Sequence, residues 1–87
     1  MSDNPYRPIA CGLHESYQYA VMTRSRLDLN WRDESGQHHQ AQVLPIDVVT
    51  RDKAEYLVVR DSSGEELAVR LDRIVGAIDL VSGKNLE

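Results

Sequence analysis

The regular spacing of turn signals constrains the fold of this chain more than any other feature. Residues 34–36 (ESG) and 61–64 (DSSG) are typical hairpin turns, and strand-forming or alternating residues flank both of them. The stretch from residue 54 to residue 74 (AEYLVVRDSSGEELAVRLDRI) shows this best, because an apolar run meets a turn and an alternating run follows. Turns that recur roughly every ten residues predict a small antiparallel barrel or sandwich.

The first predicted hairpin begins with residues 26–33 (RLDLNWRD). These residues alternate strictly, so Leu27, Leu29 and Trp31 are expected on the buried face of a half-buried strand. In the returning strand, Pro45 is expected either to end the strand or to mark a bulge, because proline cannot donate a hydrogen bond to a neighbouring strand.

Further strands follow. Residues 56–59 are rich in strand formers, residues 67–71 alternate, and residues 74–81 (IVGAIDLV) offer one more strand with Gly76 as a bend or bulge. We therefore expect five or six short strands in a sheet that bends into a barrel, because closure removes edges that invite aggregation. The strands at 56–59 and 67–71 are expected at its centre.

One helix is predicted ahead of the strands, over residues 11–24. Its apolar stripe at three- and four-residue steps is formed by Leu13, Tyr17, Ala20, Val21 and Arg24. Tyr17 and Tyr19 point to different faces of this helix. One of them is expected to pack on the sheet and the other to be exposed or to contact a partner.

The length of 87 residues predicts a single domain over residues 1–87. The last two residues, Leu86 and Glu87, resemble an end left by a cloning vector, so no structural role is expected for them. Within the domain we expect a lead-in at 1–10, the helix at 11–24, the β-barrel at 26–81 and a tail at 82–87.

Charge and cysteine content narrow the class of protein. The formal net charge is −4, which argues against direct binding of RNA or DNA and favours a basic protein partner. No signal peptide and no apolar run long enough to span a membrane is visible, and Cys11 is the sole cysteine. We expect a cytoplasmic protein with no membrane contact and no internal disulfide, and a monomer.

Catalysis and metal binding are not expected. His38 and His39 are adjacent and so lie on opposite faces of a strand, where they cannot hold one metal ion together. Cys11 with His14 one helical turn away leaves open a cysteine-dependent enzyme, which would need an abnormally reactive thiol. No phosphate-binding loop or paired-carboxylate motif is present, so no cofactor is expected.

Three segments in this order resemble a known family: YRPIAC (6–11), VVTRDKAEYLVV (48–59) and ELAVRLDRI (66–74). They resemble Rof, also called YaeO, the bacterial Rho-specific inhibitors of transcription termination, over residues 6–78. The resemblance implies a mainly β fold with one N-terminal helix, as a small highly bent antiparallel sheet or Sm-like barrel of five to seven strands. It also implies binding to the N-terminal OB-fold of transcription termination factor Rho. There the inhibitor occupies the primary RNA-binding site, acts partly as an RNA mimic and blocks RNA loading, which causes antitermination.

The resemblance also implies a contact surface, with one departure. Family members are expected to carry several acidic residues on and just before the helix, whereas this chain has only Glu15, with Gly12, Leu13 and Gln18 at the other positions. A lost interfacial charge costs on the order of 2 kcal/mol if it was buried against a cation. The expected partner-binding residues are His14, Glu15, Gln18, Tyr19, Arg51 and Asp52.

Two other functions stay open at this point. An Sm-like module that binds RNA directly would form an oligomer, such as a ring, and bind RNA in a salt-sensitive way. An adaptor for another basic protein is also left open, because the helix departs from the family pattern.

Overall fold

The computed structural model describes the backbone of residues 11–86 and the side chains of residues 15–86. One helix precedes five strands, which pair antiparallel in the order β4-β3-β2-β1-β5. The elements are α1 (Cys11–Thr23), β1 (Leu27–Arg32), β2 (His38–Arg51), β3 (Ala54–Arg60), β4 (Glu66–Arg70), the 3₁₀ turn η1 (Leu71–Arg73) and β5 (Ile74–Asp79). The predicted fold class, mainly β with one N-terminal helix, is confirmed.

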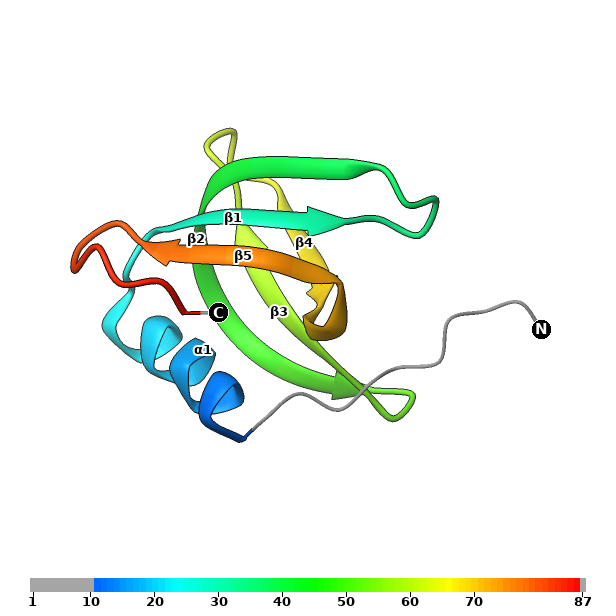
Figure 1. Ribbon diagram of the computed structural model, residues 1–87, viewed down its shortest axis with the longest axis horizontal. Helices are drawn as coiled ribbons and strands as arrows, with labels where there is room; N and C mark the ends of the chain where they lie inside the picture. Colours follow the sequence, from blue (N-terminus) through cyan, green and yellow to red (C-terminus); the bar gives the residue numbers. More distant parts are fainter. Residues whose placement is uncertain (1–10, 87) are drawn as a thin grey trace.

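Strand β2 bends the sheet. Its first half pairs with β1 and its second half, from Leu44 onward, pairs with β3. The register shifts between Pro45 and Asp47, where Pro45 lies fully buried. Proline is tolerated at such a bulge because its missing N–H is not needed there. The strand therefore continues past Pro45 and curves through the molecule, as Figure 1 shows.

The bent sheet remains open. In the part of the chain that the structure describes, no ladder joins β4 to β5, and these strands form the two ends of the sheet order. The expected closure into a barrel is therefore wrong, and β4 is an edge strand rather than a central one. The physical reason lies in η1, which turns the chain so that β5 pairs with β1 instead of β4. The register shift beside Gly76, between Asn30 and Trp31 of β1, confirms the predicted bulge.

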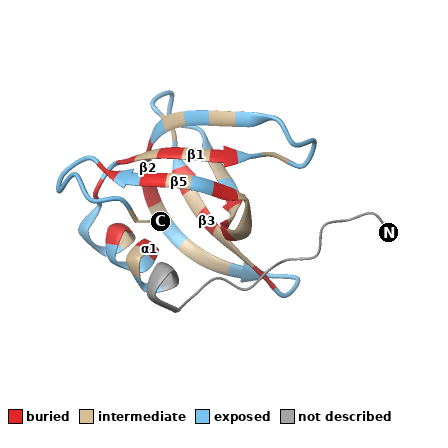
Figure 2. Cartoon of the chain, viewed as in Figure 1, coloured by how far each residue is buried: buried red, intermediate tan, exposed pale blue. Residues whose placement is uncertain are grey.

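A single core fills the inside of the bend. Each predicted strand face is buried as expected, and the helix covers the core by packing against β2 (Figure 2). Burial of apolar side chains is the main term that stabilises such a sheet. The buried residues of this cluster are Tyr17, Ala20, Leu27, Leu29, Trp31, Val43, Leu57, Val59, Val69, Leu71, Ile74 and Ala77.

The segment after β5 is part of the fold, which corrects the expectation of a tail without structural role. Asn85 forms a β-bridge with Ile78, and the N–H of Leu86 donates to the carbonyl oxygen of Ala77 over 2.7 Å. Leu86 is partly buried against the core. The segment therefore covers one edge of β5, which an open sheet would otherwise leave unpaired.

Two hairpin loops are built in the same way from the same pattern, aspartate-any-serine-glycine. Oδ1 of Asp33 accepts the N–H of Ser35 and the N–H of Gln37, both at 2.9 Å. Oδ1 of Asp61 accepts from Ser63 at 2.9 Å and from Glu65 at 3.0 Å. The glycine of each loop takes positive φ, +87° at position 36 and +91° at position 64. The loop sequence therefore specifies both hairpins locally, before any packing.

No helix within residues 11–86 is long and apolar enough to cross a membrane.

Candidate functional site

Three of the predicted contact residues lie on the outer side of α1. Glu15, Gln18 and Tyr19 are all exposed, and Tyr19 retains 66% of its accessible surface. Tyr17 is fully buried, so the prediction that the two tyrosines face opposite ways is confirmed. His14 belongs to α1, but its side chain lies outside the described residues.

The C-terminal end of α1 sets the orientation of the helix relative to β1. Arg24 takes a left-handed conformation, with φ of 55°. The N–H of Arg24 donates to the oxygen of Val21, and the N–H of Ser25 donates to the oxygen of Ala20 over 3.1 Å. This pair of bonds is a Schellman ending, formed here with arginine where glycine is usual. The chain turns sharply into β1, and the exposed face of the helix stays free of the sheet.

The other two predicted contact residues lie at the β2–β3 turn. Arg51 pairs with Ala54 across the hairpin, so the loop consists of only Asp52 and Lys53. Both loop residues have positive φ, 51° and 65°. Such a turn normally carries asparagine and glycine, because in the left-handed conformation the Cβ atom of other residues comes too close to a carbonyl oxygen. The loop therefore keeps two charged side chains where glycine is preferred.

Arg51 is held in place by an aromatic ring. Its guanidinium carbon lies 5.6 Å from the centre of the Tyr56 ring, which is within the range of a cation–π contact. In Figure 1 this turn lies at the lower right and α1 at the lower left. The predicted contact residues therefore lie on two separate elements, α1 and the β2–β3 turn.

A groove runs along α1 that the sequence did not predict. It has a volume of about 670 Å³ and contains two predicted contact residues, Glu15 and Tyr19. The remaining lining comes from Ser16 and Thr23 of the helix, Ser25, Asp79, and four residues of the C-terminal segment: Val81, Ser82, Lys84 and Leu86. The signal that was overlooked is the sequence Asp79 to Lys84, a third aspartate-to-glycine loop that folds the segment back on β5.

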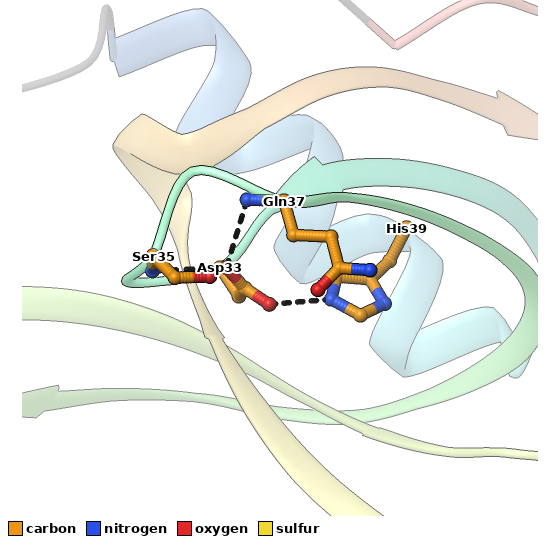
Figure 3. A network of polar contacts seen from close by, with 4 residues as sticks. All are labelled: Asp33, Ser35, Gln37 and His39. Atoms are coloured by element: carbon orange, nitrogen blue, oxygen red, sulfur yellow. Dashed lines mark hydrogen bonds and ion pairs between the residues drawn. The ribbon is translucent and has the colours of Figure 1, made fainter.

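At the far end of the sheet, Asp33 organises the β1–β2 hairpin (Figure 3). In addition to the two backbone N–H groups, its carboxylate accepts the Ser35 hydroxyl at 2.6 Å and Nε2 of His39 at 2.7 Å. The hydrogen bonds from Ser35, then that from His39, hold the pKa of Asp33 far below its usual range. The carboxylate is therefore ionised and can only accept, so Nε2 of His39 carries a proton. This network was not predicted from the sequence.

His38 and His39 have different surroundings. His38 is exposed, whereas the His39 ring lies against Trp31, with ring centres 5.4 Å apart and an angle of 19° between the planes. No group of three or more histidine, cysteine, aspartate or glutamate side chains able to hold a metal ion occurs among the side chains of residues 15–86. The side chain of Cys11 lies outside that range.

A second hollow, of about 220 Å³, lies between the end of β1 and strand β4. Arg32 and Arg73 line it, and neither forms an ion pair with another described residue. Other residues at its rim are Trp31, Asp33, Glu34, Tyr56, Leu67, Ala68, Val69 and Arg70. The hollow therefore combines cations, carboxylates and aromatic rings at the gap that an open sheet leaves.

Comparison with known proteins gives one family. Residues 13–78, more than half of the chain, match the family model described as the WYL domain. The match covers most of α1, strands β1 to β4, the loops between them and β5 up to Ile78. Comparison with curated protein sequences finds no match.

Proposed function

The chain belongs to the WYL domain family, and we propose that it is a cytoplasmic, non-catalytic, Rof-type inhibitor that binds transcription termination factor Rho. In this proposal the protein occupies the primary RNA-binding site in the N-terminal OB-fold of Rho and blocks RNA loading. The family description names no partner, so the proposal depends on the residues of this chain and on their resemblance to Rof.

The observation that carries the proposal is the exposure of the predicted contact residues. Glu15, Gln18 and Tyr19 project from α1, and Arg51 and Asp52 project from the β2–β3 turn. An exposed aromatic side chain flanked by polar ones is typical of a protein interface. The RNA-binding site of Rho is expected to be basic, because it binds RNA. The net charge of −4 of this chain favours association with such a site.

The strained β2–β3 turn supports the same proposal. Non-glycine residues in left-handed conformations cluster at functional sites, where the side chain is needed despite the strain. Asp52, a predicted contact residue with φ of 51°, is such a residue. The resemblance to Rof independently indicates this loop as a second contact with Rho.

A competition titration tests the proposal. Rho hexamers are loaded with fluorescent oligo(dC), and the protein is added at moderate salt while fluorescence anisotropy is recorded. Displacement of the oligonucleotide is expected, and Glu15→Lys should displace it about three- to tenfold less effectively because it reverses an interfacial charge. Glu34→Lys, which makes the same charge change in the exposed β1–β2 turn, is the matched control and should displace like the wild type.

Direct RNA binding is the second candidate, and one observation favours it. Arg32 and Arg73 lie beside aromatic rings in the hollow at the sheet gap, which is a combination that binds single-stranded nucleic acid. The carboxylates of Asp33 and Glu34 at the same rim and the overall negative charge oppose it. Titration of fluorescent oligo(dC) and oligo(U) with the protein in the absence of Rho decides between the two. Saturable binding that Arg32→Glu abolishes would replace the Rho proposal with this one.

A further inference from the structure

The groove between α1 and the C-terminal segment has two walls of different origin. One wall is the exposed face of α1, with Glu15 and Tyr19. The other is the turn that follows β5, with Val81, Lys84 and Leu86. Figure 1 shows the C-terminal segment running back from the end of β5 toward α1.

The C-terminal wall is held rigidly by Asp79, which is 7% exposed. Its carboxylate accepts the N–H of Val81 at 2.8 Å and the N–H of Ser82 at 3.1 Å. Its own backbone N–H donates to the oxygen of Lys84, and its oxygen accepts from Gly83 over 2.7 Å. The wall is therefore ordered before any partner arrives, and little conformational entropy is lost when one binds.

Two large apolar side chains are exposed in this groove. Tyr19 and Val81, which line it, are 66% and 79% exposed. The other large apolar side chains that are exposed among the described residues, Met22, Val75, Ile78 and Leu80, do not line it. Exposed apolar side chains with polar groups between them are typical of an interaction surface.

The charges of the groove indicate what the partner must present. Glu15 lies on the helix wall and forms no ion pair with a described residue. The carboxylate of Asp79 is already used by two backbone N–H groups. A side chain with an apolar stem and a cationic end fits this arrangement, because the stem can pack on Tyr19 and Val81 while the cation meets Glu15.

We infer that this groove receives a lysine or arginine side chain from a basic segment of the protein partner. The inference rests on the proposed function, since Rho is the partner that supplies the basic segment. The inference adds the C-terminal segment, residues 80–86, to the contact surface. In it, the ring of Tyr19 packs against the apolar part of the incoming lysine or arginine side chain. Lys84 opposes the incoming charge, so its replacement by an acid should strengthen binding.

Two pairs of variants test the inference in the oligo(dC) competition assay with Rho. Val81→Ser should weaken displacement about fivefold, whereas Val75→Ser, which changes a valine of β5 that is 55% exposed and lies outside the groove, should leave it unchanged. Lys84→Glu should improve displacement about threefold or more, whereas Arg32→Glu, the same charge change at the far end of β1, should improve it less. Tyr19→Ala should weaken displacement about tenfold.

The outcomes separate the groove from the wider proposal. If the wild type displaces oligo(dC) and the groove variants behave like their controls, the groove is not the contact, although Rho binding stands. If the wild type displaces nothing at high micromolar concentration, Rho is not the partner, and this inference fails with it. Circular dichroism and thermal unfolding of each variant verify that the fold is intact, which is expected because the altered side chains are exposed.

Discussion

The imidazole of His39 stacks on the indole of Trp31, directly across the β1–β2 ladder, with the ring centres 5.4 Å apart. The same imidazole donates from Nε2 to the carboxylate of Asp33 over 2.7 Å. One histidine therefore joins the core side of the hairpin to its loop. Because Trp31 is the chain's single tryptophan, tryptophan fluorescence reports on the surroundings of this one side chain.

The first prediction concerns that fluorescence. His39→Gln removes the ring that stacks on the indole, so Trp31 becomes more accessible to water and its emission maximum should shift to longer wavelength. His38→Gln, which removes the exposed neighbour, should leave the emission spectrum unchanged. An unchanged spectrum in His39→Gln would contradict the stacking.

The second prediction concerns acid stability. The pKa of Asp33 is lowered from its ordinary value of 3.8, so its ionised form stabilises the fold above that pH and this contribution is lost as the pH falls below it. Urea titrations between about pH 5 and 2 should show the free energy of unfolding decreasing with pH. Asp33→Asn should be less stable at neutral pH and show a flatter profile.

A control for the acid titration is available in the next residue. Glu34 is exposed, and its carboxylate accepts no hydrogen bond from the described residues. Glu34→Gln should therefore retain the wild-type profile, and an equal flattening in both variants would show that Asp33 is not the source.

The third prediction tests the loop pattern. Gly64 has φ of +91° and open space around it, so any cost of Gly64→Ala comes from the backbone alone. We expect a loss of about 1–2 kcal/mol in the free energy of unfolding. Gly76→Ala is the control, because its φ is not positive and the added Cβ would meet Asn30 at an ordinary 3.9 Å. Chemical denaturation of both variants should separate them, and equal losses would refute the conformational explanation.

The fourth prediction compares two ion pairs. Nε of Arg70 donates to Asp72 over 2.6 Å, and the two side chains are only 16% and 9% exposed. Asp72→Ala should cost about 2 kcal/mol, because it removes a nearly buried carboxylate from the guanidinium that it binds. Glu66→Ala breaks the Arg60–Glu66 pair, whose side chains are 49% and 52% exposed, and should cost about 0.5 kcal/mol or less. Thermal and urea denaturation measure both, and similar losses would show that burial does not govern these pairs.

The fifth prediction separates strain from contact in the β2–β3 turn. Lys53→Gly removes a side chain from a left-handed position and should raise the free energy of unfolding by about 1 kcal/mol. It should leave oligo(dC) displacement from Rho unchanged. Asp52→Gly should keep the fold stable but weaken displacement. Equal displacement by both variants would exclude Asp52 from the contact surface.

Much of the local structure could be predicted from the residues alone. The alternation of Leu27, Leu29 and Trp31 specifies which strand face is buried, since successive side chains point to opposite sides of a sheet. The opposite faces of Tyr17 and Tyr19 follow from helical geometry in the same way. The members of the proposed contact surface, from Glu15 to Asp52, were named from the resemblance to Rof. Their exposure follows from local features, because they lie on a helix face and in a hairpin turn.

Features that depend on pairing between segments far apart in the chain could not be predicted from the sequence. Whether the sheet closes is decided by the partner of β5, and its pairing with β1 is made across more than forty residues of chain. The return of Leu86 to Ala77 and the groove it helps to form beside Tyr19 are decided at the same level. Alternation and turn residues determine the strands of this protein because they act between neighbours in sequence. The open edge and the groove belong to the tertiary structure, because each requires segments far apart in the chain to meet.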